Sequence, residues 1–147
     1  MIINFLSIIF LSKSSQKHNY MKHDEIIDDI FSKLKGKKLY KIEYEYKKLK
    51  GECDILSYFN NKLYLYEVKS TDKQSNRNKA LEQLIKDYIY FSNYYIYDKA
   101  YLFYIHSYKK SYKVELIGVI NYDYKTLYPE IPRDLFEKYL EVKWKYL

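Results

Sequence analysis

The sequence contains few of the residues that mark several common protein classes. Its 147 residues include three glycines, two prolines and one cysteine. So few glycines exclude a collagen-like chain, a flexible linker and a glycine-rich phosphate loop, and two prolines exclude a proline-rich spacer. The single cysteine excludes a disulfide scaffold and an all-cysteine zinc site. It also fits a reducing compartment, so we expect a cytoplasmic protein.

Apolar, aromatic and basic side chains are abundant instead. Hydrophobic residues make up 48% of the chain, which argues against disorder. A chain of this length forms one domain that buries roughly 68–70% of its unfolded surface, so it needs no disulfide or structural metal. Tyrosine occurs 21 times and raises the aromatic fraction to 20%. The formal net charge of +7 favours an anionic partner.

Residues 1–20 differ from the rest of the chain, and we interpret them as an extension of a domain at residues 21–147. Residues 1–11 are almost continuously apolar, and residues 13–20 are polar. The apolar run is shorter than the roughly 20 residues that a membrane span needs, and no basic residue precedes it as in a signal peptide. We therefore expect no membrane partner. Two alternatives remain open: a strand or helix docked on the domain, or a segment without a native role.

Hydrophobic periodicity predicts eight elements within the domain. Apolar residues at helical spacing predict helices at residues 23–35 and 79–95, and a third helix follows Pro132 at residues 133–146. Alternating β-formers predict strands at residues 39–47, 52–59, 62–70, 99–107 and 113–122, and residues 71–78 are expected to form a polar loop. The order α-β-β-β-α-β-β-α predicts an α/β fold with a mixed central sheet of about five strands flanked by helices.

The hairpin between the second and third predicted strands brings charged residues together. Asn60 and Asn61 tolerate the positive φ that a two-residue turn requires, so opposed residues have numbers that add up to 121. Asp54 then faces Glu67, and Glu52 faces Lys69 on the same side of the sheet. Facing carboxylates repel each other unless a cation lies between them, and Mg²⁺ prefers oxygen ligands. A lysine beside such a site can assist a metal-bound water, which predicts hydrolysis of a phosphoester.

These residues resemble the PD-(D/E)XK nuclease superfamily, whose pattern matches Gly51-Glu52-Cys53-Asp54 and, after a hairpin, Glu67-Val68-Lys69. The resemblance covers residues 24–91 and is closest to archaeal Holliday-junction resolvases. It implies a restriction-endonuclease-like fold and a nuclease that cleaves DNA, including structured or branched DNA, with Mg²⁺ or in its place Mn²⁺ and with no small-molecule cofactor. It implies Asp54 and Glu67 as metal ligands, the Val68 carbonyl as a third ligand and Lys69 as the catalytic lysine.

Two helical residues extend the resemblance, and two positions depart from it. Glu25 is similar to a helix glutamate of the resolvases and would support the metal or its water. Gln83 is similar to the glutamine of the helix after the motif and would orient the site or the nucleic acid. Cys53 stands where proline is frequent, and Tyr88 follows Gln83 by five residues instead of four, which puts a RecB-like exonuclease in doubt. Small members of this superfamily often form dimers, so a homodimer is one oligomeric state that the resemblance implies for this protein.

Plainer interpretations compete with these. Asp54 and Glu67 could form a strand-end pair in water, Glu25 could be an ordinary first-turn acid, and Gln83 could lie on a solvated face. Cys53 is expected in the core, and neither His23 nor His106 has a partner at zinc-ligand spacing. The alternative functions are a nucleic-acid-binding module on the same fold that no longer cuts, and a RecB/Cas4-like exonuclease.

Basic residues cluster near the motif. We expect phosphate contacts from the turn at residues 47–50, before the first strand of the motif hairpin, and from the loop after Lys69, through Lys47, Lys48, Lys50, Lys73, Arg77 and Lys79. Most tyrosines are expected to pack in strands, whereas Tyr94, Tyr95 and Tyr97 are candidates for stacking on bases.

Overall fold

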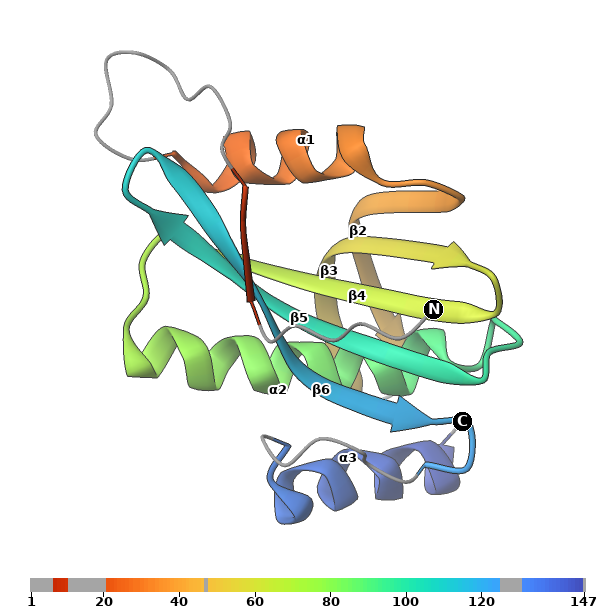
Figure 1. Cartoon of the computed structure of the whole chain (residues 1–147). Coiled ribbons are helices and arrows are strands. Elements are labelled where there is room, and N and C mark those ends of the chain that lie inside the picture. The colour runs from red at the N-terminus through yellow and green to blue at the C-terminus, as the bar shows by residue number, and fades with distance from the viewer. Residues whose placement is uncertain (1–6, 11–20, 47, 125–130, 147) are drawn as a thin grey trace.

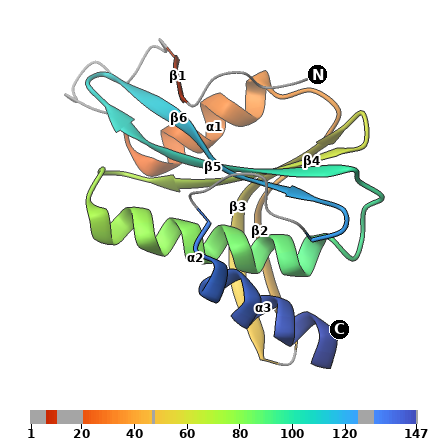
Figure 2. The same cartoon turned by 60° about the horizontal axis from the view of Figure 1, so that its bottom comes forward.

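A computed structural model describes residues 7–10, 21–46, 48–124 and 131–146, and of these 7–10 and 144–146 by their backbone alone. One six-stranded sheet crosses the molecule, with one helix on one face and two on the other (Figures 1 and 2). In chain order the elements are β1 (Ser7–Phe10), α1 (His23–Lys33), β2 (Lys37–Tyr46), β3 (Leu49–Phe59), β4 (Lys62–Lys69), α2 (Gln74–Phe91), β5 (Lys99–Tyr108), β6 (Ser111–Asn121) and α3 (Arg133–Tyr146).

The expected fold class is confirmed, with one strand more than predicted. The strands lie in the order β1-β6-β5-β4-β3-β2, and β4 and β5 are parallel whereas the other neighbours are antiparallel. The added strand is β1, which pairs with β6 at the sheet edge, so the docked-strand alternative holds for Ser7–Phe10. Among the described residues, no helix is both long enough and apolar enough to cross a membrane.

Two hydrophobic cores lie on opposite faces of the sheet. On one face, α1 packs Ile26, Ile27 and Ile30 against the sheet. On the other, α2 packs residues such as Leu84 and Ile85, and α3 adds Phe136. Most of β4 and β5, and residues 53–57 of β3, are buried on both faces of the sheet, as is typical of central covered strands.

The predicted hairpin is confirmed in its turn and in part of its register. Asn60 and Asn61 have φ of 51° and 58°, as a two-residue hairpin turn requires. The β3–β4 ladder runs from Phe59–Lys62 to Ile55–Tyr66 and follows the expected register. Asp54 and Glu67 lie one step beyond the last of these pairs.

The period-two alternation of β3 breaks at Asp54. Cys53 and Leu56 pack in the α2-side core, whereas Ile55 packs in the α1-side core. Strict alternation would put Cys53 and Ile55 on the same face. Lys41, which lies between the paired residues Tyr40 and Ile42 on β2, has a positive φ of 50°, so both strands change direction at this level.

Helix α2 begins earlier than predicted, and the expected loop at residues 71–78 is wrong from Gln74 onward. Polar side chains support the first turn: the Asn76 amide donates to Thr71, and the Gln74 amide donates to Asn78. These bonds join polar side chains of the first turn to one another and to the segment before it, so a polar stretch can begin a helix. Arg77 and Lys79 are therefore helical.

Candidate active site

Asp54 and Glu67 meet where β3 and β4 separate. Both carboxylates are buried, with Asp54 5% and Glu67 6% exposed. The backbone N–H of Val68 donates to Oδ2 of Asp54 over 2.8 Å, which connects the two strands just after their ladder ends. The plainer interpretation of a strand-end pair in water does not match this burial.

The buried pair carries unbalanced negative charge. Burial raises the pKa of Glu67 well above its ordinary value, and the carboxylates of Asp54 and Asp87 raise it further. Lys69 acts in the opposite direction, with Nζ 3.4 Å from Oε2 of Glu67. The other oxygen of Glu67, Oε1, is buried and has no hydrogen-bond partner among the described residues. A buried acceptor without a donor beside a second carboxylate is what a cation would satisfy.

The donor set fits a hard divalent cation that keeps most of its waters. Among the described residues, no three His, Cys, Asp or Glu side chains form a complete metal-binding group. Two carboxylates are enough for Mg²⁺, which is held by one or two of them together with water and substrate phosphates. Asp54 and Glu67 supply those carboxylates, and the role of the Val68 carbonyl stays a prediction.

Sequence reasoning missed His23, which contacts Asp54. Nε2 of His23, in the first turn of α1, lies 3.5 Å from Oδ2 of Asp54. Its hydrogen bond to Asp54 raises the pKa of His23 to about 8, although partial burial acts against this shift. Glu25 lies two residues further along the same turn and is half-buried. The available signal was the position of His23 in that first turn, which also made Glu25 a candidate.

Gln83 lies beside the carboxylates. A hollow of about 260 Å³ is lined by Glu67, Lys69, Lys79, Glu82, Gln83 and Lys86, and we call it the α2 groove. Glu67 and Lys69 enter it from β4, and the other four come from α2. The structure thus brings Asp54, Glu67, Lys69 and Gln83 to one region, as expected.

The six residues that were expected to contact phosphate do not lie together in the structure. Lys79 lines the α2 groove, and Lys73 is exposed just before α2. Arg77 forms an ion pair with Glu115 and lies over the Tyr104 ring. Lys50 and Lys48 are exposed at the β2–β3 end, and Lys47 lies outside the described residues.

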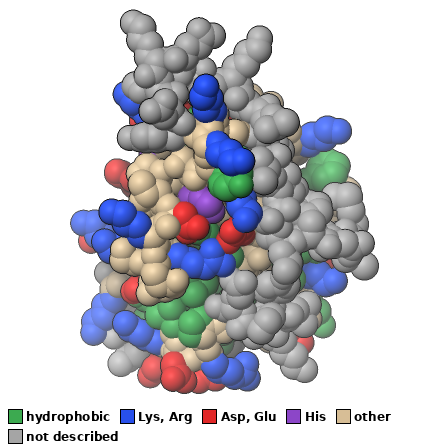
Figure 3. Space-filling view, turned by 60° about the vertical axis from the view of Figure 1, so that its left-hand side comes forward, with side chains coloured by type: hydrophobic (Ala, Val, Ile, Leu, Met, Phe, Trp, Pro, Cys, Tyr) green, Lys and Arg blue, Asp and Glu red, His purple; other side chains and the backbone are tan. Residues whose placement is uncertain are grey.

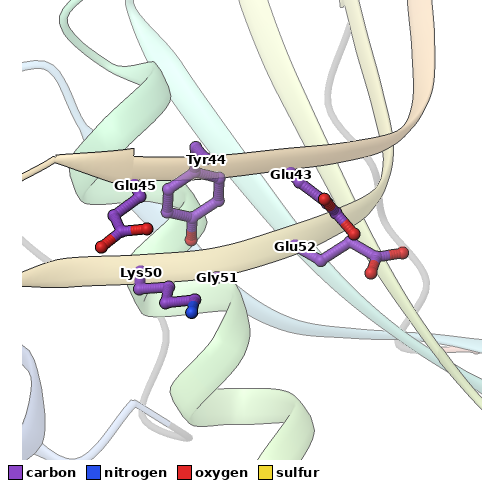
Figure 4. A pocket seen from close by; sticks show the side chains of 6 residues that line it. All are labelled: Glu43, Tyr44, Glu45, Lys50, Gly51 and Glu52. Carbon is purple, nitrogen blue, oxygen red and sulfur yellow. The ribbon is translucent and has the colours of Figure 1, made fainter.

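A second hollow, of about 470 Å³, lies between β2 and β3 and is lined by Glu43, Tyr44, Glu45, Lys50, Gly51 and Glu52 (Figure 4). We call it the hairpin hollow. Glu52 is in register with Glu43 of β2, and the two carboxylates extend in the same direction. The expected approach of Glu52 to Lys69 is thus replaced by a pairing with β2, while Lys69 lies next to Glu67. Lys50 shares its surroundings with three glutamates, which makes this hollow less favourable to phosphate than the α2 groove.

A buried histidine network anchors the segment after Lys69. Nε2 of His106 lies 3.6 Å from Asp72 and 3.7 Å from Glu115, and the Tyr104 hydroxyl donates to Asp72 over 3.0 Å. These contacts fix the chain between β4 and α2 against β5 and β6. Figure 3 shows one side of the molecule without residue labels, and on it acidic, histidine and basic side chains lie close together.

The three candidate stacking tyrosines are not equivalent. Tyr94 is 64% exposed. Tyr95 packs on Tyr58 with ring centres 5.0 Å apart, and the Tyr97 hydroxyl is hydrogen-bonded to that of Tyr88. Only Tyr94 of the three thus offers a largely open ring.

The two buried carboxylates of Asp54 and Glu67 can bind a divalent cation, and the Lys69 ammonium group lies beside them. The α2 groove next to them is lined by lysines of α2. Cys53 is fully buried in the α2-side core, and burial raises the pKa of its thiol, so it is a packing residue as expected. Scans of the chain against protein-family models, curated proteins and solved structures found no match.

Proposed function

We propose that this chain is a Mg²⁺-dependent nuclease of the PD-(D/E)XK type that hydrolyses phosphodiester bonds of DNA. The observation that carries the proposal is Oε1 of Glu67, which is buried beside Asp54 without a hydrogen-bond partner in the described part of the chain, while Lys69 lies at the other oxygen of the same carboxylate. A buried carboxylate oxygen that lacks a donor and lies beside a second carboxylate is a group that a bound cation satisfies.

Each residue of the site has a distinct task in this proposal. Asp54 and Glu67 hold the cation, and the Val68 N–H and the His23 ring keep the Asp54 carboxylate in place. Bound magnesium supplies a polarised water and charge neutralisation at the phosphate. The Lys69 ammonium lies next to Glu67, where it can stabilise the negative charge that develops on the phosphate oxygens.

The basic rim of the α2 groove supports a nucleic-acid substrate. Lys79 and Lys86 line the groove from the same helix as Gln83, and the Lys86 ammonium also donates to the Lys50 carbonyl over 3.0 Å. They match a phosphate backbone on either side of the scissile bond, in keeping with the net charge of +7. DNA as the substrate and a homodimer as the working form belong to the proposal.

The test is cleavage of supercoiled, linear, single-stranded and four-way-junction DNA in the presence of Mg²⁺, Mn²⁺ or EDTA. Asp54→Asn and Lys69→Met remove the cation ligand and the ammonium group. Lys62→Met and Asp98→Asn are matched controls, because this ion pair lies at the opposite end of β4 with 2.6 Å between Nζ and Oδ2.

Cleavage that depends on metal, is lost in both site variants and is retained in both controls is the expected result. Junction-only cleavage would assign a resolvase, and degradation from ends would assign an exonuclease. Metal-independent DNA binding with no cleavage of any substrate would instead favour the silent binding module and contradict the enzyme.

A further inference from the structure

Behind the α2 groove lies a buried carboxyl group that the proposed chemistry does not use. Asp87 of α2 is fully buried. Its Oδ1 accepts a hydrogen bond from the Tyr44 hydroxyl over 2.6 Å and another from Nε2 of Gln83 over 2.7 Å. Its Oδ2 is buried with no hydrogen-bond partner among the described residues. Burying such a group costs free energy that a leucine at this core position would not, which indicates a functional reason for its presence.

The hydrogen bonds define how the Gln83 amide is oriented. Tyr44 has one hydroxyl proton and donates it to Asp87, so the Tyr44 oxygen accepts from Nε2 of Gln83, which lies 3.2 Å away. Nε2 thus donates both to Tyr44 and to Asp87. Because the Tyr44 hydroxyl and the Asp87 carboxyl lie side by side, one N–H of Nε2 can be shared between them. The amide nitrogen is thus held inside the protein, and the carbonyl oxygen on the other arm of the amide is the group that Gln83 offers to the groove.

Gly51 has no side chain, and this leaves room for the Gln83 amide in this orientation. A Cβ atom at Gly51 would lie 2.5 Å from Nε2 of Gln83 and 2.7 Å from the Tyr44 hydroxyl oxygen. Figure 4 shows Tyr44 extending from β2 toward the strand that carries Gly51. Any side chain at this position would push the Gln83 amide out of its place.

We propose that Asp87 is a positioning residue: together with Tyr44 it fixes the Gln83 amide so that the Gln83 carbonyl oxygen accepts a hydrogen bond from the attacking water. A phosphate offers no donor to a carbonyl oxygen, whereas water does. The water is also the reactant whose orientation decides whether its lone pair faces the phosphorus atom. This inference rests on the proposed nuclease function, and its test separates the two.

The test compares Asp87→Asn with Asp87→Leu. Both remove the carboxylate, but only asparagine keeps an oxygen that can accept from Tyr44 and Gln83. We expect Asp87→Leu and Gln83→Ala each to lower kcat on the order of 10-fold to 100-fold with KM unchanged. We expect Asp87→Asn to retain most of the activity and the double variant Asp87→Leu/Gln83→Ala to be no worse than either single variant.

A measurement without metal tests the positioning directly. In ¹⁵N NMR spectra, the Gln83 side-chain amide should be protected from exchange in the wild type and in Asp87→Asn, and unprotected in Asp87→Leu. If Asp87→Leu does not fold, Gly51→Ala displaces the same amide from the other side and should show the same loss of protection and of kcat. Tyr44→Phe removes the hydroxyl that accepts from Gln83 and should also lower the amide protection and kcat. Tyr88→Phe is its matched control, since it removes from the same core a phenol hydroxyl that is bonded to Tyr97.

Equal losses in Asp87→Asn and Asp87→Leu would mean that the charge matters and would overturn the proposal. A raised KM with unchanged kcat in Gln83→Ala would assign Gln83 to substrate binding and overturn it as well. If the wild type cleaves nothing but the amide is protected as described, the positioning by Asp87 stands and the nuclease function fails.

Discussion

Nε2 of His23 lies 3.5 Å from Oδ2 of Asp54, so the first turn of α1 contacts the carboxylate at which β3 changes direction. The same oxygen accepts from the Val68 N–H. Two elements distant in sequence thus hold one oxygen of Asp54, which leaves Oδ1 as the atom that can turn to a cation. The helix that the sequence analysis linked to the site through Glu25 contacts it through the ring of His23.

This contact predicts a pH dependence of stability. The pKa of His23 rises from about 6.5 to about 8 in the folded protein, chiefly through its hydrogen bond to Asp54. A raised folded-state pKa stabilises the fold below the unfolded pKa, and the stabilisation is lost as the pH rises through 8. In metal-free protein, denaturant unfolding from pH 6 to 9 should show a steeper loss of stability in the wild type than in His23→Gln, because the buried carboxyl of Asp87, whose pKa is raised to about 8, titrates over this range in both proteins. Parallel pH profiles of the two proteins would contradict it.

Glu67 should destabilise the metal-free protein and stabilise the protein when Mg²⁺ is bound. Because burial and the neighbouring carboxylates raise its pKa, Glu67→Gln is expected to raise the metal-free unfolding free energy at pH 8. Magnesium at about 100 times its Kd should stabilise the wild type by roughly 2.7 kcal/mol and leave the variant unchanged. Thermal unfolding with and without Mg²⁺ measures both effects.

The control for this experiment is Glu137→Gln on α3, where the glutamate is exposed and pairs with Arg133. It should change neither the metal-free stability nor the response to Mg²⁺. Equal stabilisation of wild type and Glu67→Gln by Mg²⁺ would place the cation elsewhere.

The sequence predicted most of the fold because its signals were local. The Asn60-Asn61 turn and the apolar strands around it gave the hairpin and its register as far as Ile55 and Tyr66. The start of α2 was wrong because the hydrogen bonds of Asn76 and Gln74 cannot be read from composition.

The candidate site was predicted in its residues but not in its geometry. The ladder ends before Asp54 and Glu67, and the change of face at Asp54 depends on a positive φ at Lys41, a residue with no special tendency toward that conformation. His23 and Asp87 were missed because each reaches the site by tertiary packing. Asp87 contacts Tyr44 across 43 positions of sequence, which no local pattern reveals.

Lys79 and Lys86 should determine how strongly DNA binding depends on salt. Each lysine that neutralises one phosphate contributes a slope of about −0.9 to log K against log salt for duplex DNA. We therefore expect Lys79→Ala and Lys86→Ala each to weaken binding and to make the slope shallower by about that amount, measured by fluorescence anisotropy in EDTA. Lys138→Ala, an exposed lysine on α3, is the control and should change neither.

Substitutions of Lys41 by glycine and valine should change the unfolding free energy in the opposite order to that expected for an ordinary strand residue. Lys41 lies in β2 beside Asp54 with φ of 50°, a conformation that costs roughly 1–2 kcal/mol for residues with a Cβ and little for glycine. Lys41→Gly is therefore expected to preserve or raise the unfolding free energy, although glycine normally weakens strands. Lys41→Val, normally favourable in a strand, should lower it by about 1 kcal/mol or more.

Glu45 provides the matched comparison, because it is an exposed residue of the same strand that is paired in regular register with Lys50. There the order should reverse, with Glu45→Val tolerated and Glu45→Gly destabilising, when both are measured by denaturant unfolding. This reversal would show that the positive φ at Lys41 is required where β2 and β3 change direction. Valine is favourable in a regular strand but strained at a position with a left-handed backbone conformation. If valine stabilises both positions equally, β2 is a regular strand at Lys41. In that case Asp54 would face the side of the sheet that strict period-two alternation predicts, and the arrangement of the candidate site described above would be wrong.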